Sequence, residues 1–388
     1  MSDSDIDDQI RRDFAVTKKT IYMNNGAIAP TPLSTIKAVT DFMLKCAEAG
    51  PDASQTSNYV MSLLDELRTR VAHLINSDRD EVVLVQSTTE GLNIVANGID
   101  WKAGDAVVVR GGRHEHYANY LPWVSLSQRR GVQLRELAID EDGYFDLGDF
   151  EKLIKGARLV TMSHALYNTG AIMPLEDIGR VAQENNALFC VDAAQSAGTI
   201  PIDAKKIGCH FMAFPGFKWL CGPMGIGAFY CSKKASEMLT PPAIGIESAM
   251  LSEQDVIAYH DMPTRFQAGF RNFPGAAGLE ASLRYILRVG LQNVRKKNME
   301  VANALREEIG RIPGVKLYGP DDQSKRTSIV TFMAPADSSM IVKKLEQDSI
   351  IFAARDIGGG KKAVRAAPHF FNNEDEAATA AGYVKGLL

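Results

Sequence analysis

The feature that most constrains the fold is an alternation of short apolar runs with amphipathic segments between residues 81 and 232. Short runs rich in β-branched and aromatic residues are typical of strands that are buried on both faces of a sheet. Segments with helical periodicity, such as LEDIGRVAQENN, separate several of these runs. The alternation therefore predicts an α/β fold with a doubly wound, mainly parallel sheet. The predicted strands are EVVLVQS, DAVVVRGG, VQLRELAI, ARLVTMSHA, ALFCVDAAQ, HFMAFPG and GIGAFYC.

The chain of 388 residues is long enough for a large domain and a smaller one. Residues 1–30 are predicted to form an N-terminal segment, in which KKTIYMNNGAIAPTP crosses toward the active cleft. Residues 31–290 are predicted to form the large α/β domain, which ends in a long linking helix, GAAGLEASLRYILRVG. Residues 291–388 mix helical segments with short strands, and this texture predicts a smaller C-terminal α+β domain.

Composition excludes several classes of partner. The net charge of -4 offers no electrostatic reason to expect nucleic acid or an anionic membrane. The N-terminus, MSDSDIDDQIRRD, lacks the apolar core of a secretory signal, and no apolar run reaches the roughly 18 residues of a membrane span. The five cysteines form no CxxC pair, which favours reduced thiols in the cytoplasm, and no metal site is predicted.

Polar residues follow the first two predicted strands, where ligands bind in sheets of this kind. Thr88 and Thr89 stand where EVVLV gives way to a helix, so they are candidates for holding a phosphate at the helix N-terminus. A plain helix cap is the alternative. His114 and His116 follow DAVVV, and either could be a solvated side chain or a ring that stacks on a flat cofactor.

Two later strands end at a carboxylate and a lysine. Asp192 closes a very apolar strand, so it is either a cap for the next turn or the partner of a cation such as a protonated pyridine nitrogen. Lys218 is the single cation in FMAFPGFKWLCGPMGIGAFY, and it either extends to water or keeps a desolvated amine for Schiff-base chemistry. Together with the threonines and a histidine, these residues meet the needs of pyridoxal 5'-phosphate.

With these residues in place, the chain resembles the class V aminotransferase family of fold type I pyridoxal-phosphate enzymes. The family includes cysteine desulfurases, cystine C–S lyases, kynureninase and isopenicillin N epimerase-like proteins. The resemblance runs from YMNNGAIAP to VRAAPHFFNNEDE, which is nearly the whole chain. It implies an aspartate aminotransferase-like fold, a pyridoxal 5'-phosphate cofactor, a small-molecule amino-acid substrate and a homodimer.

The resemblance also implies a role for each cofactor-binding residue. In STTEGLN, Thr88 and Thr89 correspond to phosphate ligands, and in HEHYAN, His116 corresponds to the ring over the cofactor. In VDAAQSAG, Asp192 corresponds to the partner of the pyridine nitrogen, and Gln195 lies near the phenolic oxygen.

Catalytic and substrate-binding roles come from the same resemblance. Lys218, in GFKWLCGPMGIG, corresponds to the lysine that bonds the cofactor and moves a proton, and His116 joins it as a catalytic residue. Arg365, in VRAAPHFFNN, corresponds to the guanidinium that grips the substrate α-carboxylate. SHALYNTGAIMPL is similar to the cystine lyase and epimerase-like branch, where Asn168 after Tyr167 is a substrate or cofactor contact.

Three departures from the family pattern matter. The loop ARDIGGGKKAVR carries no cysteine, and none follows Cys231, so a persulfide on the enzyme is not expected. The usual Ser-Gly-His before the lysine is replaced by residues 215–217, Pro-Gly-Phe. The Gly-Thr that reaches a phosphate across the dimer is replaced by Gly269 and Phe270. Fewer phosphate ligands, or different ones, are therefore expected.

The leading hypothesis is a C–S lyase that acts on an L-amino acid without a catalytic loop cysteine. An amino-acid epimerase or an aminotransferase of the same family is the first alternative, and a non-catalytic binding protein on a decayed enzyme fold is the second. A nicotinamide site is not expected, because GPMGIG has the wrong glycine spacing and precedes a strand. In RFQAGFRNFPGAAG, Phe266, Phe270, Phe273 and Arg271 are predicted to contribute to the dimer interface, or else to pack the base of the linking helix.

Overall fold

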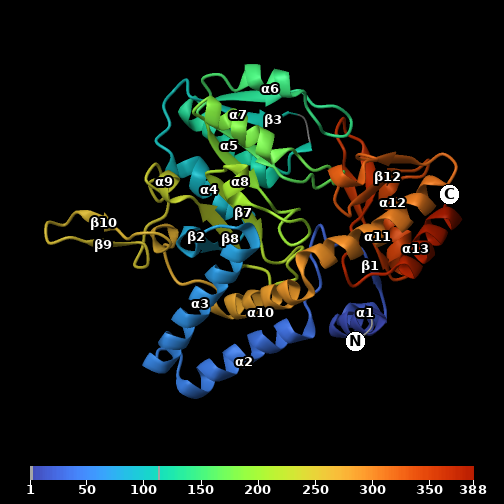
Figure 1. Ribbon diagram of the computed structural model, residues 1–388, viewed down its shortest axis with the longest axis horizontal. Helices are drawn as coiled ribbons and strands as arrows, with labels where there is room; N and C mark the ends of the chain where they lie inside the picture. The colour runs from blue at the N-terminus through green and yellow to red at the C-terminus, as the bar shows by residue number, and fades with distance from the viewer. Residues whose placement is uncertain (1–2, 112–113) are drawn as a thin grey trace.

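The computed structural model describes residues 3–111 and 114–388 and is built around a seven-stranded sheet (Figure 1). All seven strands predicted from the sequence are present. Only β8 runs in the opposite direction to the other six strands, so the expected mainly parallel sheet is confirmed. In spatial order the strands are β2 (Val82–Val85), β8 (Gly227–Cys231), β7 (Phe211–Pro215), β6 (Leu188–Asp192), β5 (Leu159–Ser163), β3 (Ala106–Arg110) and β4 (Gln133–Leu137).

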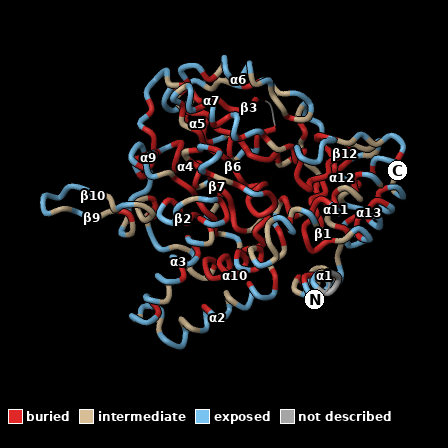
Figure 2. Tube along the Cα trace, in the orientation of Figure 1, coloured by how far each residue is buried: buried red, intermediate tan, exposed pale blue. Residues whose placement is uncertain are grey.

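Both faces of this sheet are covered, which explains its apolar strands. Successive residues of a strand point to opposite faces, and in β3 Val108 packs into one core cluster while Val107 and Val109 pack into another. Figure 2 shows the resulting buried centre. The helices after β2 in the large part of the chain are α4 (Thr88–Gly98), α5 (Tyr117–Arg130), α6 (Leu147–Leu153), α7 (Leu175–Glu184), α8 (Ala204–Ile207) and α9 (Lys233–Ser236).

The linking helix is α10 (Phe273–Val289), close to its predicted range. It packs against two long helices that precede the sheet, α2 (Leu33–Ala49) and α3 (Ser54–Ile75). A hairpin of β9 (Ala249–Leu251) and β10 (Ile257–Tyr259) projects from the body of the protein (Figure 1). Among the described residues, short 3-10 helices lie at Ala15–Lys18, Arg79–Glu81, Thr264–Phe266 and Gln323–Lys325.

The C-terminal part contains an antiparallel sheet and its own core. The strand order is β11 (Lys316–Tyr318), β12 (Val330–Met333), β15 (Lys362–Ala366) and β14 (Ala353–Asp356). The helices are α11 (Leu291–Gly310), α12 (Ser338–Gln347) and α13 (Glu374–Gly386). Strand β1 (Ile21–Tyr22) pairs with β13 (Ile350–Ile351), so the N-terminal segment joins this part of the protein. The domain boundaries at 30 and 290 stay a prediction.

The N-terminal helix α1 (Asp3–Asp13) also contacts the C-terminal part, where the guanidinium of Arg11 lies 2.8 Å from the carboxylate of Glu376. Within the described ranges, no helix is both long and apolar enough to cross a membrane. The same ranges hold no group of three or more His, Cys, Asp or Glu side chains arranged for a metal ion.

The aromatic segment before α10 divides between two environments. Phe266 is buried in the core beside the sheet, and Phe273 packs at the start of α10. Phe270, in contrast, is 82% exposed. Arg271 forms an ion pair with Glu247 at 2.9 Å within the same chain. Of the three phenylalanines, Phe273 therefore packs the base of the linking helix, Phe266 packs in the core beside the sheet, and the exposed Phe270 is the one that an interface could bury.

Candidate active site

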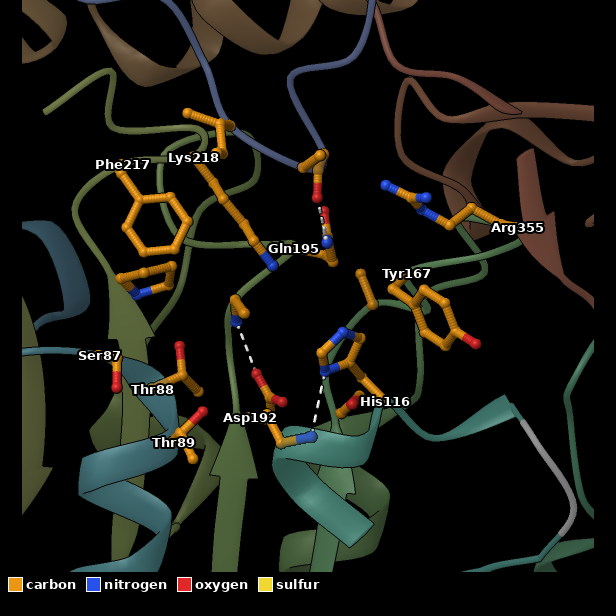
Figure 3. A pocket seen from close by; sticks show the side chains of 18 of the residues that line it. Ser87, Thr88, Thr89, His116, Tyr167, Asp192, Gln195, Phe217, Lys218 and Arg355 are labelled. Carbon is orange, nitrogen blue, oxygen red and sulfur yellow. Dashed lines mark hydrogen bonds between the residues drawn. The ribbon is translucent and has the colours of Figure 1, made fainter. Parts of the chain in front are cut away.

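A cavity of about 520 Å³ opens at the carboxyl ends of β2, β5, β6 and β7. Figure 3 shows the side chains that converge on it. Strand ends and their loops supply one wall, the N-terminal segment supplies a second, and the C-terminal sheet supplies a third. The lining residues are Gly26, Ala27, Ile28, Ser87, Thr88, Thr89, His116, Ala118, Ser163, Ala165, Tyr167, Asp192, Ala194, Gln195, Pro215, Phe217, Lys218, Arg355 and Arg365.

Lys218 follows β7 by three residues, and its amine points into the cavity (Figure 3). Burial lowers the pKa of this amine from 10.5 to about 8, and the carboxylate of Asp192 opposes the shift. The guanidinium groups of Arg365 and Arg355 lower the pKa further. A substantial fraction of Lys218 is therefore neutral near physiological pH, as a nucleophilic amine requires.

Asp192 is the last residue of β6 and is almost fully buried. Burial raises the pKa of its carboxyl group from 3.8 to about 6, although the backbone N–H of Ala194 donates to it at 2.9 Å. A buried carboxylate gains most from a cation placed beside it. A protonated pyridine nitrogen in the cavity is such a cation.

His116 caps the N-terminus of α5 and also lines the cavity. Its Nδ1 accepts the backbone N–H of Ala118 at 3.1 Å, so the ring proton sits on Nε2. Burial lowers the pKa of this imidazole to about 4, which keeps the ring neutral at physiological pH. The ring of Tyr167 meets it edge-on, with centroids 5.1 Å apart. His114 lies outside the cavity lining, so His116 is the histidine that the fold places there.

The N-terminus of α4 forms the end of the cavity suited to a phosphate. Ser87, rather than either threonine, is the cap, because its hydroxyl accepts the backbone N–H of Glu90 at 3.2 Å. The hydroxyl groups of Thr88 and Thr89 stay available to the cavity (Figure 3). Pro215 and Phe217 line it nearby and carry no polar side-chain atom. Among the described lining residues at this end, the groups suited to donate to a phosphate are therefore the N-terminus of α4 and its threonines.

Two arginines from the C-terminal sheet complete the cavity. Arg365 is almost fully buried, and it donates to the carbonyl of Tyr167 at 2.7 Å and to Oδ1 of Asn24 at 3.0 Å. Its Nε has no hydrogen-bond partner among the described residues, and burial lowers the pKa of its guanidinium to about 9. Arg355, on the neighbouring strand β14, also lines the cavity and had no distinguishing signal in the sequence.

Of the site residues implied by the family resemblance, Asn168 is the one outside the described lining. Its amide donates to the carbonyl of Asp356 at 3.2 Å and accepts the backbone N–H of Thr169 at 2.9 Å. It thereby connects the loop after β5 to the end of β14. A direct contact with substrate stays a prediction for this residue.

The N-terminal segment reaches the cavity, and Gly26 packs closely against two residues of the site. The carbonyl of Gly26 accepts Nε2 of Gln195 at 2.8 Å (Figure 3). A Cβ on residue 26 would lie 3.2 Å from Oε1 of Gln195 and 3.3 Å from the guanidinium carbon of Arg365. Both contacts are tight, so a side chain at this position would require small shifts of Gln195 and Arg365.

The family model described as Aminotransferase class-V matches residues 21–372. The chain belongs to the class V aminotransferase family. A relative from Methanothermobacter thermautotrophicus, named a probable cysteine desulfurase, is 33% identical over 95% of each chain. One from Pyrococcus abyssi with the same name is 32% identical over 99% of this chain and 98% of the relative.

Solved structures confirm fold type I for this member of the family. The apo cysteine desulfurase of Thermococcus onnurineus superimposes with a TM-score of 0.93 at 32% identity, covering 98% of this chain and 97% of that one. A cystine C–S lyase solved with cysteine persulfide has a TM-score of 0.87 at 24% identity, over 94% and 97% of the two chains. At 24% identity, this second similarity is evidence for the fold alone.

The residues of the cavity fit the cofactor of this family. One end offers a helix N-terminus with two threonine hydroxyl groups, and the strand ends offer a buried carboxylate, a neutral imidazole and a desolvated amine. This donor set matches the phosphate, the ring nitrogen, the ring face and the aldehyde of pyridoxal 5'-phosphate. The chain is therefore a pyridoxal-phosphate-dependent enzyme. The non-catalytic alternative does not hold.

Proposed function

We propose that the enzyme is a C–S lyase that acts on cystine or a cysteine-like L-amino acid without using a thiol of its own. The observation that carries the proposal is the absence of cysteine from the described residues that line the cavity. The sequence also has no cysteine after Cys231, and four of the five cysteines are buried elsewhere. A desulfurase that stores sulfur on its own cysteine needs such a thiol beside the substrate.

The cationic groups of the cavity suit an amino acid with two carboxylates. Arg365 is placed to bind one carboxylate through its planar guanidinium, which favours bidentate contacts. Arg355 gives a second guanidinium in the same cavity, as a substrate such as cystine requires. Names of relatives agree with sulfur chemistry, since two are called probable cysteine desulfurases and a structural neighbour is a cystine C–S lyase.

Lys218 is the group that moves the proton in the proposed reaction. Its amine lies in the cavity with a pKa of about 8, so it can accept the Cα proton and later return it. Pyridoxal phosphate, when bound, supplies the electron sink that makes this proton acidic. With the cofactor bound, Asp192 would maintain the positive charge of the ring nitrogen, and His116 would cover the ring face.

The atoms and electrons of the proposed reaction balance without an oxidant. The Cα–H bond breaks, the Cβ–S bond breaks, and sulfur leaves with the bonding electron pair. For cystine, one molecule of substrate and one water give cysteine persulfide, pyruvate and ammonia. For cysteine, the corresponding products are hydrogen sulfide, pyruvate and ammonia.

A product panel tests the proposal. Purified holoenzyme is incubated with cystine, cysteine and alanine, and then pyruvate, sulfide or persulfide, alanine and the inverted amino acid are measured. Pyruvate that appears in step with released sulfur supports the lyase. Alanine formed from cysteine would indicate a desulfurase. An inverted amino acid would indicate an epimerase, and a 2-oxo acid that retains its sulfur would indicate an aminotransferase.

A thiol variant makes the same test sharper. Cys46 is the one cysteine that is not fully buried, and it lies on α2 outside the cavity lining. Cys46→Ala should release pyruvate at the parent rate, whereas Lys218→Ala should not release it. Loss of activity in Cys46→Ala would contradict a reaction that is independent of an enzyme thiol.

Assembly as a homodimer in the cytoplasm is also proposed. Phe270 and Ile246 are each 82% exposed, and the side chain of Met224 is 65% exposed. Large apolar side chains that are this exposed favour burial against another copy of the chain. The five free cysteines support a reducing compartment.

A further inference from the structure

Trp219, the residue after Lys218, is completely buried and held at three points. Its indole N–H donates to Oε1 of Gln195 at 2.8 Å. Its backbone carbonyl lies 3.0 Å from Nε2 of His369, and the two rings meet edge-on with centroids 5.1 Å apart. His369 follows β15 and is itself completely buried. Trp219 is therefore fixed in place by residues from both parts of the protein.

The amide of Gln195 has two neighbours that can each play only one role. An indole N–H can only donate a hydrogen bond, and the backbone carbonyl of Gly26 can only accept one. Oε1 of Gln195 faces the indole of Trp219 at 2.8 Å, and Nε2 faces the carbonyl of Gly26 at 2.8 Å. Reversing the amide would place two donors together and two acceptors together inside the protein, which is unfavourable. The neighbours thus determine which end carries nitrogen.

We infer that Trp219 is a positioning residue that fixes the Gln195 carbonyl on its indole N–H and leaves an amide N–H of Gln195 to bind an anionic oxygen of the ligand. Gln195 has two amide hydrogens, and only one of them is used by Gly26. Since Gln195 lines the cavity, the second hydrogen is available to a ligand there. The phenolic oxygen of pyridoxal phosphate is such a ligand atom. The inference rests on cofactor binding and not on which amino acid is cleaved.

The cations of the cavity explain why the side-chain carbonyl of Gln195 would turn if the indole N–H did not hold it. A Cβ on residue 26 would lie 3.2 Å from Oε1 of Gln195 and 3.3 Å from the guanidinium carbon of Arg365, so both groups lie on the same side of Gly26. Without the indole donor, Oε1 would be a buried acceptor close to Arg365 and in the same cavity as Lys218. The amide would then turn toward these cations, and its N–H would leave the ligand oxygen.

The experiment is a pH titration of the visible absorbance of the holoenzyme, which needs no substrate. Trp219→Phe keeps the aromatic ring and removes the N–H. Losing one hydrogen bond to a charged oxygen should raise the pKa of the spectral transition by about one unit and weaken cofactor binding about tenfold. Trp101→Phe is the matched control, because buried Trp101 loses an N–H bond to the carbonyl of Ala96, outside the cavity lining. That control should leave the transition unchanged.

A double-mutant cycle separates positioning from general damage. If Trp219 acts through Gln195, Trp219→Phe shifts the spectral transition in the parent enzyme but not in a Gln195→Ala background. The inference would be overturned if Trp219→Phe caused no shift in the parent enzyme, or if it caused an equal shift in both backgrounds. It would also be overturned if Trp101→Phe caused a shift equal to that of Trp219→Phe. If Trp219→Phe does not fold, benzothienylalanine at position 219, which keeps the bicyclic shape without the N–H, is judged by the same outcomes. A negative result in the C–S lyase assay would not change these spectroscopic outcomes.

Discussion

Lys218 and Asp192 face one cavity from the ends of the neighbouring strands β7 and β6, and burial shifts the pKa of each toward its neutral form. The pKa of Lys218 falls to about 8 and that of Asp192 rises to about 6, while each charge favours the charged form of the other. The site thus keeps a reactive amine and a carboxylate that a ring cation stabilises. The following predictions depend on this pair and on its surroundings.

Lys218→Ala should lose the covalent attachment of the cofactor. Removal of a group that bonds the cofactor and transfers a proton should lower kcat on the order of 10³-fold or more. The measurement combines visible absorbance, borohydride reduction and turnover. Lys205→Ala is the control, because the amine of Lys205 is exposed and pairs with Asp78 at 3.0 Å. A parent spectrum in Lys218→Ala would contradict the assignment.

Uptake of pyridoxal phosphate by the apo enzyme should depend on pH through the Lys218 amine. Only the neutral amine attacks a carbonyl, so the uptake rate should rise with pH and level off above a midpoint near 8. Because the Asp192 carboxylate raises the pKa of Lys218, Asp192→Asn should move that midpoint lower. Stopped-flow absorbance measures both midpoints. A midpoint near 10.5, the ordinary value for lysine, would refute the proposed desolvation.

Asp192→Asn should change how the stability of the apo enzyme varies with pH. The folded-state pKa of Asp192 is raised from 3.8 to about 6, so the folded protein binds more protons than the unfolded chain between these values. Stability is therefore lost as pH rises through this window, by roughly 3 kcal/mol in total. Asp192→Asn should remove this loss, as denaturant titrations at several pH values would reveal. If the stability of the parent and of Asp192→Asn changed in parallel with pH, the raised pKa of Asp192 would be contradicted.

Arg365→Lys should impair substrate binding although it retains the positive charge. A lysine cannot form two parallel bonds to a carboxylate or retain the contacts to Tyr167 and Asn24. We expect kcat/KM to fall about 10- to 100-fold, mostly through KM. Steady-state kinetics test this, with Arg129→Lys on the exposed surface of α5 as the control. An unchanged KM in Arg365→Lys would remove this residue from substrate recognition.

Phe270→Thr should tighten cofactor binding if position 270 reaches the partner's phosphate site in the proposed dimer. One added hydrogen bond to a phosphate should lower the Kd of pyridoxal phosphate about tenfold. Phe270→Ala removes the same exposed ring without adding a hydroxyl, so it should not tighten binding. Equilibrium dialysis gives both values, and sedimentation gives the assembly state. Equal affinities for the two variants, or a fully active monomer, would rule out the shared site.

Local patterns in the sequence determined the central sheet and most of the cofactor site. An apolar strand shows its period over a few residues, and the polar residue that ends such a strand lies at the same edge of the sheet as its neighbours. For this reason Thr88, His116, Asp192 and Lys218 were all predicted, and all line one cavity. The residues alone left His114 and His116 open, the family resemblance favoured His116, and His116 is the one that lines the cavity.

Contacts between distant segments were decided only by the tertiary structure. The pairing of β1 with β13 joins residues more than 300 positions apart, and Arg365 reaches the carbonyl of Tyr167 across 198 positions. Arg355 enters the cavity, and His369 contacts the backbone carbonyl of Trp219, through the packing of the C-terminal part against the large one. No local period encodes such contacts, because they depend on how two separately formed cores meet. The sequence determined the chemistry of the site, and packing decided which side chains hold it in place.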